Sequence, residues 1–146
     1  MATYSTDKDL VYLRPNILNN GQADFSWAHE KAYDKINEII EADWYLNAAL
    51  THNIDPRDVA MDVSLLDANE LKEISVYKAL EYIYISMAKD IGPTRDGMFQ
   101  WAAWAAEQYK DSMTRLLKVG PTYDWDDDGI TQKDKFEPII RRIVRC

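Results

Sequence analysis

An acidic stretch near the C-terminus, residues 123–130, holds the side chains with the clearest potential chemistry in this sequence. Asp124, Asp126 and Asp128 alternate along it, and a glycine follows them directly. In an EF-hand loop, side chains at positions 1, 3 and 5, a glycine at position 6 and a carbonyl oxygen at position 7 surround calcium. The spacing therefore predicts a partial calcium site whose ligands are Asp124, Asp126, Asp128 and the carbonyl of Ile130.

This calcium site is incomplete in two respects. Lys135 occupies position 12, where an EF-hand carries a glutamate that closes the coordination shell. Gly120 and Pro121 also separate the acidic stretch from the helical pattern before it. The alternative interpretation is an acidic turn, in which Gly129 supplies a positive φ and the aspartates accept hydrogen bonds from backbone amides. Both interpretations stay open, and no other cofactor is indicated.

Other catalytic or metal-binding patterns lack a residue that their chemistry requires. His29-Glu30 begins a zinc-protease pattern, but Tyr33 stands where the second histidine belongs. Residues 92–97 have the glycine spacing of a phosphate loop without its lysine and hydroxyl residue. The one cysteine, Cys146, is the last residue, which argues against an internal disulfide and against a Cys-His nucleophile pair. We therefore expect a protein without catalytic activity.

Charge divides the chain at the acidic stretch. The whole chain carries −8, and residues 131–146 carry +3, from five cations and two anions, so residues 1–130 carry the difference of −11. Such an acidic body argues against general nucleic-acid binding, which needs clustered cations. The sequence has no apolar run long enough to span a membrane. The N-terminus has no apolar signal core, which predicts folding in a cytoplasm.

Apolar periodicity predicts a mainly α protein in which three long helices form a small bundle. A short helix is expected at 6–14, and long helices are expected at about 25–50, 68–90 and 95–118. Residues 51–66 have no clean period and are interpreted as a connecting loop with one weak turn or strand. Small residues at 102, 103, 105 and 106 would let a neighbouring helix approach the last long helix closely. We assign residues 1–120 to a helical bundle domain and residues 121–146 to the acidic loop and a C-terminal arm.

The C-terminal arm is basic and apolar at once. Pro138 opposes a continuous helix, so an extended segment is expected. The arm is too apolar to stay in solvent, so it needs a partner surface, on another protein or on its own bundle. The residues predicted to contact that partner are Phe136, Ile139, Ile140, Arg141, Arg142, Ile143, Val144 and Arg145.

Aromatic residues make up 12% of the chain, with five tryptophans and nine tyrosines. Trp101 and Trp104 flank the apolar stripe of the helix at 95–118, and the helix at 68–90 is rich in tyrosine. Each of these side chains is expected in the core or at a contact between subunits, because aromatics supply large contact areas in both settings. The set is large enough that we expect some of them at a contact between subunits.

The order of these parts resembles the head-to-tail connector proteins (adaptor or neck proteins) of tailed bacteriophages. The resemblance covers most of the chain as a layout: a short N-terminal helix, the segment Asp24-Phe25-Ser26, and further long helices. Its one local motif is Tyr-Asp-Trp-Asp-x-Asp-Gly at 123–129, followed by an arginine-rich end. Asp127 departs from this pattern, since a small residue is expected there.

The resemblance implies a virion structural protein of the neck, between capsid and tail, which is assembled in the host cytoplasm. Such proteins form a homo-oligomeric ring of about twelve copies below the portal protein. The ring contacts a tail or neck protein below it and lines a channel through which DNA passes. Carried onto this chain, residues 136–146 would be the portal-binding arm and residues 124–129 its hinge. The alternative, drawn from the residues alone, is a calcium-responsive binding module built on the acidic loop.

Overall fold

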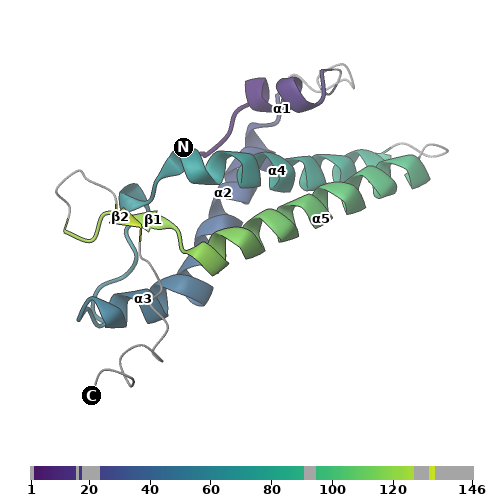
Figure 1. The fold of residues 1–146 in the computed structure, drawn as a ribbon. Helices are drawn as coiled ribbons and strands as arrows, with labels where there is room; N and C mark the ends of the chain where they lie inside the picture. The colour runs from purple at the N-terminus through teal and green to yellow at the C-terminus, as the bar shows by residue number, and fades with distance from the viewer. Residues whose placement is uncertain (1, 16, 18–23, 91–94, 127–131, 134–146) are drawn as a thin grey trace.

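The computed structural model describes residues 2–15, 17, 24–90, 95–126 and 132–133. Within these ranges the protein is mainly helical (Figure 1). A π-helical turn, Glu41–Tyr45, joins α2 to α3, and a 3-10 turn, Val63–Leu65, precedes α4. The helices and strands are α1 (Asp7–Leu13), α2 (Ser26–Ile40), α3 (Leu46–Thr51), α4 (Ala68–Asp90), α5 (Arg95–Val119), β1 (Thr122–Tyr123) and β2 (Gln132–Lys133).

The helices expected from periodicity are present with bounds close to those predicted. The helix expected at 25–50 is less regular than predicted, because the π-helical turn interrupts it between α2 and α3. Residues 51–66, expected to be a connecting loop with one weak turn or strand, contain the 3-10 turn and end in an isolated β-bridge between Leu66 and Tyr123. That bridge was not predicted, since it joins residues far apart in the sequence. Most of the arm, residues 134–146, lies outside the described residues.

Helix α4 is the central element of the body. It packs most extensively against α5 and also against α2, and Figure 1 shows α5 running beside α4 while α2 crosses them. A helix between two neighbours must be apolar on more than one side. The buried residues of α4 are accordingly spread around it: Leu71, Ile74, Ser75, Val76, Ala79, Leu80, Ile83, Tyr84, Met87 and Ala88. None of the helices in the described ranges combines the length and apolarity needed to cross a bilayer.

Helix α5 buries a single stripe against α4. Ala102, Ala105, Tyr109 and Met113 are buried at spacings of three and four residues, which is one face of an α-helix. The alanines place no bulk between the two helices, as expected from the sequence. Ala103, by contrast, is exposed, so the small residues do not all serve the same contact.

The π-helical turn places two adjacent aromatic residues in the core. Trp44 is 9% exposed and Tyr45 1% exposed, although consecutive residues of an α-helix point in directions about 100° apart. The Tyr45 hydroxyl donates a hydrogen bond to the backbone oxygen of Val59, 2.8 Å away. Burial is the largest factor that raises the pKa of Tyr45, and the nearby Glu41 raises it further. The phenol is therefore neutral at physiological pH and acts as a donor to the 51–66 segment.

Tyr109 allows a paired test of buried phenols. Its hydroxyl is buried without a hydrogen-bond partner, and burial raises its pKa to about 12. Because an unsatisfied buried hydroxyl is costly, Tyr109→Phe should raise the free energy of unfolding by about 1 kcal/mol. The matched variant Tyr45→Phe removes the hydrogen bond to Val59. It should lower the free energy of unfolding by about the same amount. Urea unfolding followed by circular dichroism measures the stability of both variants. A destabilised Tyr109→Phe variant would contradict the assignment of an unsatisfied hydroxyl to Tyr109.

Candidate functional site

The acidic loop connects the two strands of a small hairpin. β1 and β2 pair antiparallel, with Thr122 opposite Lys133 and Tyr123 opposite Gln132. On its other side, Tyr123 forms the bridge to Leu66. The residues on either side of the acidic loop are therefore paired with each other. In an EF-hand a helix lies on each side of the loop, whereas strands lie on each side here. The resemblance to that motif is therefore limited to the order of the aspartates.

Backbone hydrogen bonds fix the first strand of this hairpin to the segment before α4. The Asp67 amide donates to the carbonyl of Thr122 (3.1 Å), and the Asp124 amide donates to the carbonyl of Leu65 (3.0 Å). Glu70, in the first turn of α4, accepts two more hydrogen bonds from Thr122: one from its amide (3.0 Å) and one from its hydroxyl (2.7 Å). Hydrogen bonds to a carboxylate are stronger than neutral ones, so Glu70 is a major anchor of the hairpin.

An aromatic cluster packs against Trp125 at the start of the acidic loop. Its members are Trp44, Tyr45, His52, Tyr123 and Trp125. The Trp125 ring stacks on the His52 ring with centroids 4.1 Å apart. It also contacts Tyr123 at 4.6 Å and stacks parallel to Tyr45 at 6.0 Å. The amide of Asp62 donates to the Tyr123 hydroxyl, and burial is the main cause of the raised pKa of that hydroxyl. The cluster ties α3 and the loop's first residues into one unit.

The two described aspartates of the predicted calcium site lie in different environments. Asp124 is buried, at 4% exposure, whereas Asp126 is exposed. Asp128 and Ile130 lie outside the described residues. Within the described ranges, no three His, Cys, Asp or Glu residues gather in a geometry that could hold a metal ion. The calcium site thus stays a prediction, with two of its four ligands placed.

The predicted partner-binding residues of the arm all lie outside the described residues. These are Phe136, Ile139, Ile140, Arg141, Arg142, Ile143, Val144 and Arg145. The structure does describe the point from which the arm leaves, because Lys133 is the last residue of β2 and is paired with Thr122. The root of the arm is therefore attached to the same hairpin as the acidic loop.

A buried polar network that sequence analysis missed joins the N-terminal segment to α2 and α4. The Ser5 hydroxyl oxygen lies 2.7 Å from Nδ1 of His29 and 2.8 Å from the hydroxyl of Ser75. On the other side of the imidazole, Nε2 of His29 lies 3.1 Å from a carboxylate oxygen of Asp7. A sequence signal did exist: His29 falls beside the apolar stripe of α2, and a buried histidine needs polar partners.

This order of serine, histidine and aspartate is that of a hydrolase triad, but its surroundings are those of a structural network. A nucleophilic hydroxyl must reach a substrate, and Ser5 is only 2% exposed. The backbone amide of Phe25 also approaches the Asp7 carboxylate, which further links α1 to the start of α2. The network thus holds the N-terminal segment in place where apolar burial is limited, since Leu10 is the one buried residue of α1.

Glu70 offers a direct test of how the hairpin is held. Replacing it by alanine leaves the amide and hydroxyl of Thr122 without their acceptor, so Glu70→Ala should lower the free energy of unfolding by about 1–3 kcal/mol. Glu107→Ala, which removes an exposed carboxylate of α5, is the matched control and should stay within about 0.5 kcal/mol of wild type. Hydrogen exchange at the Thr122 amide should accelerate in the first variant only. Equal protection of that amide in both would show that Glu70 is not the anchor.

Comparison of the chain with protein-family profiles, curated proteins and solved structures gave no match. The resemblance to tailed-phage connectors therefore depends on the sequence layout and on the motif at 123–129. Its functional implications are proposals about this chain.

Proposed function

We propose that this protein is a structural adaptor of a tailed-phage neck. In this proposal its copies form a ring below the portal protein, line the DNA channel, and dock their C-terminal arms on the portal. The body of each copy is a small bundle of the three long helices, from which the arm extends. The observation that carries the proposal is the fixed root of the arm: strand pairing at Lys133 attaches an apolar, basic segment to an anchored hairpin.

A fixed root makes docking of the arm less costly. The strand β1 is held by Glu70, by the backbone of residues 65–67 and by the aromatic cluster, so β2 starts the arm from one defined place on the body. Less freedom is then lost when the arm binds a partner. Each isoleucine that becomes fully buried on the partner stabilises the complex by about 1.5–3 kcal/mol. The three arginines of the arm would set its register through charge pairing.

The charge distribution is compatible with a channel for DNA. Residues 1–130 carry −11, and phosphates are repelled by a surface of the same sign. DNA would pass such a wall without adhering to it, as transport through a neck requires. The cations of residues 131–146 would instead face the portal, away from the DNA path.

Truncation after Lys133 tests the role of the arm. This end point keeps β2, so the hairpin and the helical body should remain folded, with an unchanged far-ultraviolet circular dichroism spectrum. Binding to the purified portal protein, measured by interferometry, should be lost. A second variant with glutamate at positions 141, 142 and 145 keeps the apolar residues and should bind at least about tenfold more weakly. Undiminished portal binding by the truncated protein would refute the arm assignment.

We propose calcium-responsive binding as the alternative function. The observation that favours it is the pairing of β1 with β2, which closes a loop containing four aspartates between residues 124 and 128. Closing a loop of like charges raises the local negative potential, and a hard cation relieves it. Trp125 lies between the first two of these aspartates and contacts the aromatic cluster.

Tryptophan fluorescence reports on this alternative. Calcium added to the full chain should change the emission, because Trp125 is next to the proposed ligands. Asp126→Ala should abolish the change, while Asp58→Ala, an exposed aspartate outside the loop, should leave it intact. Emission that is indifferent to millimolar calcium in the wild-type chain would eliminate the calcium-responsive module.

A further inference from the structure

Two exposed apolar patches lie at opposite ends of the protein. The leucine patch comprises Leu46, Leu50, Ile54 and Pro56, from α3 and the turn that follows it. The tryptophan patch comprises Trp101, in the first turns of α5, and Arg14, which follows α1 and lies over the Trp101 ring. Figure 1 shows α3 at one end of the body and the start of α5 at the other. Neither patch belongs to the acidic loop or to the arm.

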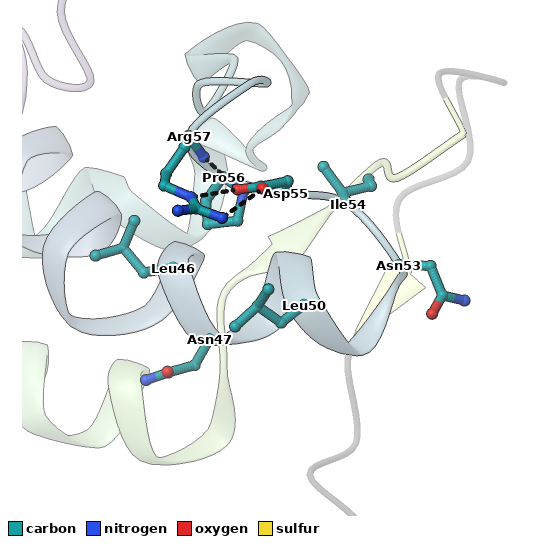
Figure 2. A pocket seen from close by; sticks show the side chains of 8 residues that line it. All are labelled: Leu46, Asn47, Leu50, Asn53, Ile54, Asp55, Pro56 and Arg57. Carbon is teal, nitrogen blue, oxygen red and sulfur yellow. Dashed lines mark hydrogen bonds and ion pairs between the residues drawn. The ribbon is translucent and has the colours of Figure 1, made fainter.

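The leucine patch is an open groove of about 610 Å³. Leu46 and Leu50 project from α3 with exposures of 44% and 60% (Figure 2). Asp55 and Arg57 at its border form an ion pair with each other at 3.0 Å, so their charges largely cancel. Large aliphatic side chains exposed side by side on a helix are typical of a surface that another element covers.

The tryptophan patch has the composition of an interaction hot spot. Trp101 is 42% exposed, whereas Trp104, on the same helix, packs against the core. The guanidinium carbon of Arg14 lies 3.6 Å from the centre of the Trp101 ring and 5.1 Å from that of Trp104. Arginine and tryptophan are the residues most often responsible for binding energy at protein interfaces.

The two patches are complementary in charge. Among the described residues Arg14 has aromatic neighbours but no carboxylate partner, and its buried Nε atom makes no hydrogen bond. Near the leucine patch, Asp43 is exposed in the π-helical turn that leads into α3, three residues before Leu46. Asp58, also exposed, follows the turn that borders the groove. Among the described residues, a cation without a carboxylate partner at one end of the protein thus matches exposed carboxylates at the other.

We infer that the tryptophan patch of one copy docks on the leucine patch of the next copy. The inference rests on the self-assembly proposed above and names the surfaces that produce it. In this contact Trp101 covers the groove beside Leu46 and Leu50, and Arg14 pairs with Asp43 or Asp58. A contact between two different patches repeats from copy to copy, and closes into a ring when its rotation allows.

The charges favour this head-to-tail contact over a symmetric one. If two leucine patches faced each other, Asp43 and Asp58 of both copies would be brought together. If two tryptophan patches faced each other, two Arg14 guanidinium groups would meet. Like charges at an interface cost several kcal/mol, whereas the head-to-tail contact brings opposite charges together.

A complementation experiment with blocked patches tests the contact. Leu50→Glu blocks the leucine patch and Trp101→Glu blocks the tryptophan patch, while each leaves the other patch intact. Sedimentation of the wild-type chain at rising concentration should show growth beyond a monomer. Each variant alone should associate at least about tenfold more weakly. An equal mixture of the two should form a heterodimer that grows no further, because one intact patch of each kind remains.

Two further variants assign the roles within the contact. Arg14→Glu should behave like Trp101→Glu: it should pair with the Leu50→Glu variant and not with the Trp101→Glu variant. Val119→Glu alters an exposed apolar residue outside both patches and should associate as the wild type does. Circular dichroism confirms that each variant is folded. A wild-type chain that stays monomeric at every concentration, or a Trp101→Glu variant that self-associates as strongly as the wild type, overturns the inference.

This outcome is separable from that of the proposed function. If copies carrying both Leu50→Glu and Trp101→Glu still assemble as a ring on the portal, the contact is wrong and the adaptor function stands. If the blocked variants complement as expected but the full-length chain never binds the portal, the contact stands and the adaptor function is wrong.

Discussion

The anchoring of Thr122 and Tyr123 is the interaction on which most of this architecture depends. These two residues pair with β2 on one side and with Leu66 on the other, and the Glu70 carboxylate accepts two hydrogen bonds from Thr122. The anchor joins the end of α5 to the segment before α4. It also positions Trp125 on the aromatic cluster, which reaches α3 through His52. Without it, β1 and the described start of the acidic loop, residues 124–126, would have no defined place relative to the helices.

The helical body is organised by a different constraint, the burial of α4 on more than one side. Because α4 is buried by both α5 and α2, its apolar residues cannot form a single stripe, and they follow its circumference. The N-terminal segment adds little apolar area. It is held instead by polar contacts, among them the Ser5–His29–Asp7 network and an ion pair between Lys72 and Asp9. The long helices are thus attached through apolar contacts and α1 through polar ones. Some apolar side chains of α3 and α5, among them Leu50 and Trp101, stay exposed.

Those uncovered side chains link the fold to the proposed assembly. A monomer gains nothing from exposing Leu50 and Trp101, since burying either would stabilise it. Their position at opposite ends of the body, together with the opposite charges beside them, suits a contact that repeats from copy to copy. The arm, which leaves from the anchored hairpin, is then available for a different partner. Ring contacts and portal contacts would use separate surfaces of the same subunit.

The sequence by itself determined the helices, because apolar periodicity, proline and glycine act locally. The bounds of α1, α4 and α5 follow from such signals, and so does the order of aspartates in the loop. Only the tertiary structure decided the hairpin, the bridge between Leu66 and Tyr123 and the Ser5–Ser75 contact. The bridge and the Ser5–Ser75 contact join residues that are 57 and 70 positions apart, respectively. Such pairs leave no local period in the sequence, since they depend on how the helices pack.

Exposure was likewise decided by packing. Trp101 and Trp104 both flank the apolar stripe of the same helix, and the sequence left both between core and interface. In the structure Trp104 packs on the core cluster that includes Ala102 and Ala105, while Trp101 stays exposed beneath Arg14. The difference arises because α4 and α1 cover only part of the α5 surface. Neighbouring helices therefore decide which of two similar aromatic residues stays exposed. The sequence pattern of a single helix does not carry this information.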